Sequence, residues 1–246
     1  MLTGTADPDL LARGAATLAS FATEPMKLHG VETLQVLCEI ERTGSASLLP
    51  PGLHPTLPPA VSWLVQRVAE SPWGAFTIAQ CRVECRSGLR PRGFLRGGVA
   101  DNEAAAVELG ARWGYALRPG RIRLERGYDR IRATVRLDNE QLLDVALRDP
   151  MPLRSSDAYY VASMHLAHTP RGLRLVQVDP EFEVERAERG RPVLRGFEAS
   201  AWGCDGVRPS YPVAASFTLA TVTLPALRYV CRPDVLAFEG SERVDT

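Results

Sequence analysis

Side chains that could carry covalent chemistry are scarce in this chain, and amines are the scarcest. Lys27 is the only lysine among the 246 residues, and every other strongly basic side chain is an arginine. An amine must be neutral to form an imine with a carbonyl compound, whereas arginine stays protonated and is a very poor nucleophile. Imine chemistry in this protein would therefore depend on where Lys27 lies.

Two arginines flank an aromatic turn. Arg112 precedes Trp113-Gly114-Tyr115, and Arg118 follows it. A guanidinium group can bind a carboxylate or polarise a carbonyl, so both arginines are candidates for holding an acidic ligand. The alternative is a surface role in an arginine-rich chain. Trp113 and Tyr115 could line a ligand pocket, although aromatic residues at the end of a helix more often belong to the core.

Two pairs of residues that contain histidine are each separated by three positions. His29 and Glu32 could form a proton-transfer pair, and a solvated loop histidine is the alternative. His165 and His168 share the same spacing, but they fall in a segment that reads as strand or loop, and no carboxylate has matching spacing. We therefore expect no metal site.

The elements that must position these residues are mostly strands. The 20 Gly and 19 Pro are spread along the chain and indicate many turns, which favours a β-rich protein. Helices are expected over 7–22, started by Asp7-Pro8, and from Asn102 to Gly114. Strands are expected at residues 32–41, 60–69, 75–86, 92–100, 121–126, 130–137, 141–147, 173–186 and 219–231. We predict a β-rich α+β fold with a single domain over 1–246, built as an antiparallel barrel or sandwich with a helical arm at 1–26.

Composition excludes several classes of partner. The formal net charge is zero and aromatic residues are sparse around the arginine-rich strands, so we expect no nucleic-acid binding. No apolar run is long enough for a transmembrane helix, and the N-terminus lacks the pattern of a signal peptide. With five cysteines expected to be buried and reduced, we predict a cytoplasmic protein. Motifs for nucleotide, dinucleotide or zinc binding are missing, so no cofactor and no metal are expected.

Several short motifs follow one another in an order that resembles the acetoacetate decarboxylase family, over about residues 27–232. They are Leu48-Leu49-Pro50, Ser71-Pro72-Trp73-Gly74-Ala75-Phe76, Asp101-Asn102-Glu103-Ala104-Ala105, Trp113-Gly114-Tyr115 and Leu219-Ala220-Thr221-Val222-Thr223-Leu224-Pro225. The resemblance implies a cone-shaped β-barrel with an internal, largely apolar pocket for a small carbonyl or carboxylate compound. It also implies a homo-oligomer.

The chain departs from the family where the family's chemistry is done. The family places two adjacent lysines after the aromatic turn: the first forms an imine with a β-keto acid, and the second lowers the pKa of the first. Leu117 and Arg118 stand at these positions, and leucine has no lone pair. The resemblance gives no reason to place Lys27 in the pocket, so we predict that the protein is not a Schiff-base decarboxylase.

Other polar positions of the family site also differ. One family acid corresponds to Ile78, which follows Phe76-Thr77, and a second falls near Trp63. The family's arginine falls near Val31 or Glu32. Gly97-Gly98 stands where bulkier strand residues are expected, which could widen the cavity. The predicted ligand-contacting residues are Arg112, Trp113, Leu117, Trp63, Ile78, Phe76, Gly97 and Gly98, and the predicted catalytic residues are Arg118, Tyr115, His29 and Glu32.

Two functions of different class remain open at this point. One is a lysine-independent, lyase- or cyclase-like enzyme that acts on a β-keto acid or a polyketide-like carbonyl compound. It would carry out cyclisation, dehydration, aldol-type chemistry or imine-free decarboxylation, using a dry pocket and fixed cations to stabilise an enolate. The other is a non-catalytic barrel that binds a small molecule and releases it unchanged.

Overall fold

The computed structural model describes residues 2–41 and 44–244. Its strands are β1 (Ala16–Thr17), β2 (Met26–Ile40), β3 (His54–Pro55), β4 (Ala60–Val68), β5 (Phe76–Ser87), β6 (Arg90–Ala100), β7 (Arg118–Pro119), β8 (Arg121–Arg126), β9 (Arg130–Leu137), β10 (Glu140–Leu153), β11 (Ser163–Thr169), β12 (Gly172–Val178), β13 (Glu181–Phe197), β14 (Pro209–Leu224), β15 (Tyr229–Cys231) and β16 (Ser241–Arg243). The helices are α1 (Pro8–Leu11), α2 (Glu103–Trp113) and α3 (Ala237–Gly240), with short 3-10 helices η1 (Ser45–Leu48), η2 (Ser155–Asp157) and η3 (Ser200–Trp202).

All of these strands belong to one sheet. Its order is β16-β15-β12-β11-β6-β5-β4-β2-β14-β13-β10-β9-β8, and β1, β3 and β7 pair beside this path. Along the path the neighbours are antiparallel except β11 and β6, which pair in parallel. The path ends at β16 and β8, so among the described residues the sheet stays open. The fold is thus β-rich with few helices, as predicted, and the sheet curves strongly without its two ends pairing.

Most predicted elements are found, but two of the predicted strands each correspond to two strands in the structure. The segment predicted as a strand at 173–186 is two strands, β12 and β13, and the one predicted at 219–231 is β14 and β15. Pro180 and Pro225 lie in the gaps, where a residue without an N–H cannot extend a ladder. Strand β11 lies in a segment that was read as strand or loop, and the structure shows a strand.

The helix expected over 7–22 is wrong beyond its first turn. Asp7 caps α1 as predicted, and its carboxylate accepts a hydrogen bond from the backbone N–H of Asp9 at 2.9 Å. The helix ends at Leu11, and Gly14 adopts a left-handed conformation with φ of 81°. The chain then turns into β1, which pairs with β11. The arm at 1–26 is therefore mostly extended.

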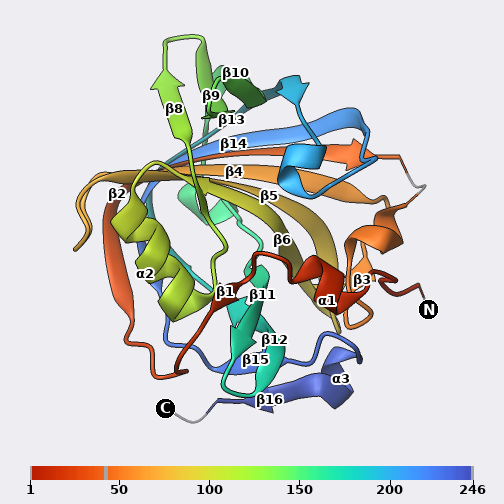
Figure 1. Ribbon diagram of the computed structural model, residues 1–246. Coiled ribbons are helices and arrows are strands. Elements are labelled where there is room, and N and C mark those ends of the chain that lie inside the picture. Colours follow the sequence, from red (N-terminus) through yellow and green to blue (C-terminus); the bar gives the residue numbers. More distant parts are fainter. Residues whose placement is uncertain (1, 42–43, 245–246) are drawn as a thin grey trace.

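Two hydrophobic cores lie on opposite faces of the long central strands. Figure 1 shows β4, β5 and β6 curving across the molecule, with β8, β9, β10 and β13 towards the top of the view and α2, β11, β12, β15 and β16 below. One core contains Trp63, Ile131 and Phe217 and faces β8–β10. The other contains Ile78, Trp113 and Val222, and α2 covers it.

Helix α2 is fixed at both ends. The side chain of Asn102 accepts a hydrogen bond from the backbone N–H of Ala105 at 3.0 Å. Gly114 ends the helix in a left-handed conformation, as the sequence predicted. The indole of Trp113 donates to the carbonyl oxygen of Pro225 at 2.8 Å. These contacts place Tyr115 at the edge of the second core.

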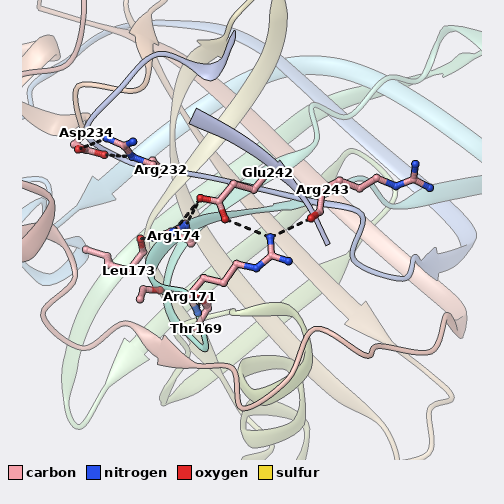
Figure 2. Close-up of polar contacts among 9 residues, drawn as sticks. Thr169, Arg171, Leu173, Arg174, Arg232, Asp234, Glu242 and Arg243 are labelled. Carbon is pink, nitrogen blue, oxygen red and sulfur yellow. Dashed lines mark hydrogen bonds and ion pairs between the residues drawn. The ribbon is translucent and has the colours of Figure 1, made fainter. Parts of the chain in front are cut away.

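The C-terminal strand is held by a cluster of paired charges, which we call the C-terminal clasp: Arg171, Arg174 and Glu242. Arg174 donates to one carboxylate oxygen of Glu242 at 2.9 Å, and Arg171 donates to the other at 3.3 Å. Arg171 also donates to the carbonyl oxygen of Arg243 at 3.0 Å (Figure 2). Burial by itself raises the pKa of Glu242, but the two arginines more than offset it and hold that pKa below its usual value.

None of the described helices is long and apolar enough to span a membrane.

Candidate active site in the interior cavity

A small cavity lies in the core that α2 covers. Its volume is about 30 Å³, which is room for a water molecule. The residues that surround it come from β2, β4, β5, α2, β11, β13 and β14 and from the segment before β11. They are Leu28, Val31, Leu64, Gln66, Val68, Phe76, Ile78, Arg82, Leu109, Tyr115, Tyr160, Val161, Ser163, Pro180, Phe182, Val222 and Leu224.

The most unusual member of this wall is Arg82, on β5. The residue is 5% exposed, and no carboxylate lies within ion-pairing distance of its guanidinium in the part of the chain that the structure describes. Its Nε donates to Oε1 of Gln80 at 2.8 Å, its Nη2 donates to the same oxygen, and its Nη1 donates to the carbonyl oxygen of Val161 at 3.3 Å. Burial lowers the pKa of Arg82 from its usual value. The carboxylate of Glu84, two residues along β5, offsets part of this effect from beyond ion-pairing distance. A buried cation without a directly paired anion is costly, and a guanidinium remains protonated.

Three further polar atoms, next to Arg82 or Tyr115, are buried without hydrogen-bond partners among the described residues, and of their residues only Ser163 lines the interior cavity. They are Nε2 of Gln80, Oγ of Ser163 and Nε2 of His165. Leaving one such atom unpaired costs roughly 1–3 kcal/mol, so buried polar groups are normally paired. Unpaired polar groups, donors as well as acceptors, beside a cavity are typical of a site that binds a polar ligand.

Tyr115 and His165 pack against each other. Their ring centroids are 4.0 Å apart. Nδ1 of His165 lies 3.2 Å from the carbonyl oxygen of Trp113, and since a carbonyl only accepts, Nδ1 must carry the proton. Burial, with a contribution from Arg82, lowers the pKa of His165 to about 3. His165 is therefore neutral at neutral pH, and it is a weak base.

The hydroxyl of Tyr115 is a donor at this site. The residue is 4% exposed, and burial raises the pKa of its hydroxyl, with Arg82 and the neighbouring hydroxyl of Ser163 offsetting part of that effect. The phenol therefore keeps its proton at neutral pH and can donate a hydrogen bond to an oxygen atom in the cavity.

Leu117 and Arg118, which the sequence analysis matched to the family's two lysines, face a different space. Leu117 and Arg118 line an outer hollow of about 350 Å³ together with Gly97 and Gly98. Arg118 is exposed, and its Nη2 donates to the carbonyl oxygen of Ala201. Arg118 does not line the interior cavity.

The two glycines do not widen the interior cavity as expected. A Cβ on Gly98 would lie 2.5 Å from Cδ2 of Leu117, and a Cβ on Gly97 would lie 3.1 Å from the carbonyl oxygen of Trp202. Their missing side chains are replaced by these neighbours, so the space next to β6 is already occupied.

Of the remaining predicted contacts, Phe76 and Ile78 line the interior cavity and Trp63 does not. Successive residues of a strand point to opposite faces, so Trp63 belongs to the other core, where its ring meets Phe197 at 4.9 Å. Leu64, one position further on, faces the cavity.

The expected proton-transfer pair is not formed. His29 is exposed and bridges to Glu70 through its backbone. The carboxylate of Glu32 is ion-paired with Arg67.

Two further basic residues lie away from the cavity. Lys27 is exposed, and its Nζ lies 3.5 Å from a carboxylate oxygen of Glu183. Arg112 stacks on Trp113 and donates to the carbonyl oxygen of Glu24 at 2.9 Å.

Sequence reasoning missed Gln80, Arg82 and Ser163, although a signal for two of them was present. Ile78 was assigned to the pocket, and the two-residue period of a strand places residues 80 and 82 on the same face. In the described ranges, no group of three His, Cys, Asp or Glu side chains could hold a metal ion.

Several solved structures share this fold. The acetoacetate decarboxylase of Legionella pneumophila subsp. pneumophila str. Philadelphia 1 matches with a TM-score of 0.71 and 17% identity, over 83% of this chain and 86% of that chain. The enduracididine biosynthesis enzyme MppR, complexed with pyruvate, matches with a TM-score of 0.69 and 15% identity, over 84% and 90%. An acetoacetate decarboxylase-like enzyme from Sphingomonas wittichii RW1 matches with a TM-score of 0.67 and 16% identity, over 86% and 98%.

No curated protein matches the sequence significantly. The model of the family described as acetoacetate decarboxylase (ADC) matches residues 13–190, well over half of the chain. This protein is therefore a member of the acetoacetate decarboxylase family.

Proposed function

We propose that this protein decarboxylates a 3-oxo acid (a β-keto acid) without forming an imine. The observation that carries the proposal is Arg82, a buried cation in the cavity wall with no carboxylate partner among the described residues. Such a cation, next to the phenol of Tyr115, is suited to an oxygen atom on which negative charge develops.

The polar groups of the cavity favour this reaction over those that need a base. Arg82 and Tyr115 are donors, the nearby His165 is a weak base, and the described lining contains no Asp or Glu. Aldol-type chemistry and dehydration begin by removing a proton from carbon, which requires a base. Decarboxylation of a 3-oxo acid requires none, because loss of carbon dioxide itself generates the enolate.

The proposed reaction breaks one carbon–carbon bond of the substrate and transfers one proton to it. The bond between the carboxyl carbon and C2 breaks, and carbon dioxide leaves. The electron pair of that bond moves into an enolate, whose charge rests on the oxygen of C3. Arg82 and Tyr115 donate hydrogen bonds to that oxygen, and C2 then takes a proton from water. The carboxylate of the substrate would lie against apolar residues such as Ile78 and Val222, which solvate a charge poorly.

No lysine amine is placed to form an imine with a substrate in the interior cavity. Leu117 stands where the family's reactive lysine is expected, and the only lysine, Lys27, is exposed and ion-paired. Structures of MppR, which shares this fold, contain pyruvate or the condensation product of pyruvate and imidazole 4-carboxaldehyde. These ligands support an oxo acid as the class of substrate for this protein too.

The size of the cavity bears on the alternative, a barrel that only stores a ligand. About 30 Å³ does not accommodate a four-carbon acid, so the side chains around it must move when a ligand enters. Tyr160 and Val161 are the candidates: the hydroxyl of Tyr160 bonds to Oγ1 of Thr218 at 2.9 Å, and Val161 is held through Arg82. An enzyme and a binding barrel would both need this opening, so release of carbon dioxide is what separates them.

The test is release of ¹³CO₂ from 1-¹³C-labelled acetoacetate and its longer homologues. We expect turnover by the wild type and a loss of about 100- to 1,000-fold in kcat/KM for Arg82→Met, the range seen when one donor to an oxyanion is removed. Arg189→Met, at an exposed arginine of β13, is the matched control and should retain turnover. Tight binding of the acids without release of carbon dioxide would favour the binding barrel instead.

We also propose a cytoplasmic, homo-oligomeric protein. All five cysteines are unbridged and buried, which suits a reducing compartment. Oligomers are an expectation that the family relationship raises, and sedimentation velocity would test it.

A further inference from the structure

A second, larger hollow lies next to the interior cavity. Its volume is about 430 Å³. We call it the apolar hollow because Leu37, Pro58, Ala60 and Ala214 are among the residues that line it. Val161 lines both the apolar hollow and the interior cavity. The two spaces are therefore separated by little more than the segment that runs from Tyr159 to Val161.

Strand β5 connects the two spaces along one face. Arg82 lines the interior cavity, and Glu84, two residues further along, lines the apolar hollow. Two residues of a strand span about 7 Å, and residues two apart point to the same face. Nη1 of Arg82 donates to the carbonyl oxygen of Val161, so the guanidinium lies at the boundary between the two spaces.

The apolar hollow is suited to hydrocarbon. Its described walls carry no arginine or lysine, and its acidic groups are Glu39 and Glu84. Ser62 donates to Glu84 at 2.6 Å, and burial raises the pKa of Glu84 above its usual value. A negatively charged group would be repelled here, whereas an uncharged chain would replace water next to Leu37, Pro58 and Ala60.

We infer that the apolar hollow binds the alkyl tail of the substrate, so that the preferred substrate is a 3-oxo acid with a tail several carbons longer than the methyl group of acetoacetate. This inference rests on the proposed function, because it places the oxo group at Arg82. The carboxyl group then points into the interior cavity, and the tail passes Val161 into the apolar hollow. The small interior cavity has no room for such a tail.

The experiment compares kcat/KM for 3-oxo acids of four, six, eight and ten carbons. For the wild type we expect a rise of about fourfold for each methylene that enters the apolar hollow. Ala214→Trp would fill the hollow from its exposed side on β14 and should lower the ratio of kcat/KM for the eight-carbon acid to that for acetoacetate at least tenfold. Ala111→Trp, on the exposed face of α2, is the control and should leave this ratio as it is.

The outcomes separate the two proposals. Turnover that is independent of chain length, or an equal loss for short and long acids in Ala214→Trp, would overturn the inference and leave the decarboxylase proposal standing. A complete lack of turnover and binding with every acid would overturn both.

Discussion

Arginines serve opposite purposes in two regions of this molecule. In the C-terminal clasp, Arg171 and Arg174 share the carboxylate of Glu242, so every charge has a partner (Figure 2). In the interior cavity, Arg82 is more deeply buried than either, yet its acceptors are an amide oxygen and a backbone carbonyl. The partly exposed arginines of the C-terminal clasp are thus paired with a carboxylate, whereas the more deeply buried Arg82 is not.

Under the proposed function, the difference separates a region that stabilises the fold from a region that binds a ligand. A partly exposed ion pair adds a little to stability, and leaving a charge buried without its counter-ion subtracts from it. Groups that act on a substrate are often held at a cost to stability. The contrast therefore predicts that removing Arg82 harms activity and spares the fold, whereas breaking the clasp does the reverse.

The largest expected effect tests both halves of this contrast in one pair of variants. In Arg82→Met/Gln80→Leu, neither side chain is left facing an unpaired partner, so we expect activity to fall about 100- to 1,000-fold while the free energy of unfolding is not reduced. In Arg174→Met we expect activity to persist and the free energy of unfolding to fall by about 1 kcal/mol. Urea titration and release of carbon dioxide measure the two quantities. Equal losses of stability in both variants would remove the contrast.

The second effect concerns the neutral donor of the cavity. Tyr115→Phe keeps the ring that packs on His165 and removes only the hydroxyl. A hydrogen bond to a charged oxygen contributes about 1.5–3 kcal/mol, so we expect kcat to fall about 10- to 150-fold. Arg118→Ala should cost much less than either change at the cavity, because Arg118 lies at the outer hollow. A larger loss of activity in Arg118→Ala than in the variants of Arg82 and Tyr115 would instead place the active site at Arg118, as the sequence analysis predicted.

The third effect is a dependence of stability on pH. The folded protein holds the pKa of His165 at about 3, well below the usual value of about 6.5, so the unfolded chain binds more protons between these values. Stability should therefore fall as pH is lowered from about 6.5 towards 3, by up to about 1.4 kcal/mol per pH unit from this residue. Urea titrations at several pH values should give a shallower slope for His165→Asn, while His168→Asn, at an exposed site, should match the wild type.

The smallest expected effect is a loss of stability when the charge of Glu242 is removed from the C-terminal clasp. Glu242→Gln keeps the shape of the side chain and removes its charge, and we expect a loss of less than about 1 kcal/mol. Because Arg174 and Arg171 hold the pKa of Glu242 below its usual value, this contribution is present above about pH 4.5 and is lost as pH falls through the lowered pKa. Hydrogen exchange of β16 would report the loss. Unchanged protection of β16 would show that the clasp does not hold the C-terminal strand.

The sequence predicted local elements well where turns were explicit, and it predicted the site less well. β8 and β9 were predicted with their observed bounds because Gly120, Gly127 and Asp138 punctuate them. The segment of β11 was left open between strand and loop because Ser163–Thr169 has few β-branched residues, and the burial of Ser163 and His165 was therefore not predicted.

The positions of the site residues depend on which face of a strand each occupies. Trp63 was placed in the pocket, and a shift of one residue moves it to the other core. Leu117 and Arg118 were placed by their match to the family, but the spacing of an alignment does not say which cavity a side chain faces. The two-residue period of β5 could have predicted that Arg82 faces the cavity. Nothing in the sequence shows that no carboxylate lies within ion-pairing distance of it.

The central claim is that the chemistry depends on Arg82 and needs no amine, and the most direct test is the turnover of a protein without lysine. Lys27→Arg removes the only lysine and retains a cation for the ion pair with Glu183. Release of ¹³CO₂ from a labelled 3-oxo acid would be measured for this variant and the wild type, with borohydride present and intact mass recorded. We predict equal rates and no covalent adduct in either protein. A large loss of rate in Lys27→Arg, or a borohydride-trapped adduct in the wild type, would contradict the account.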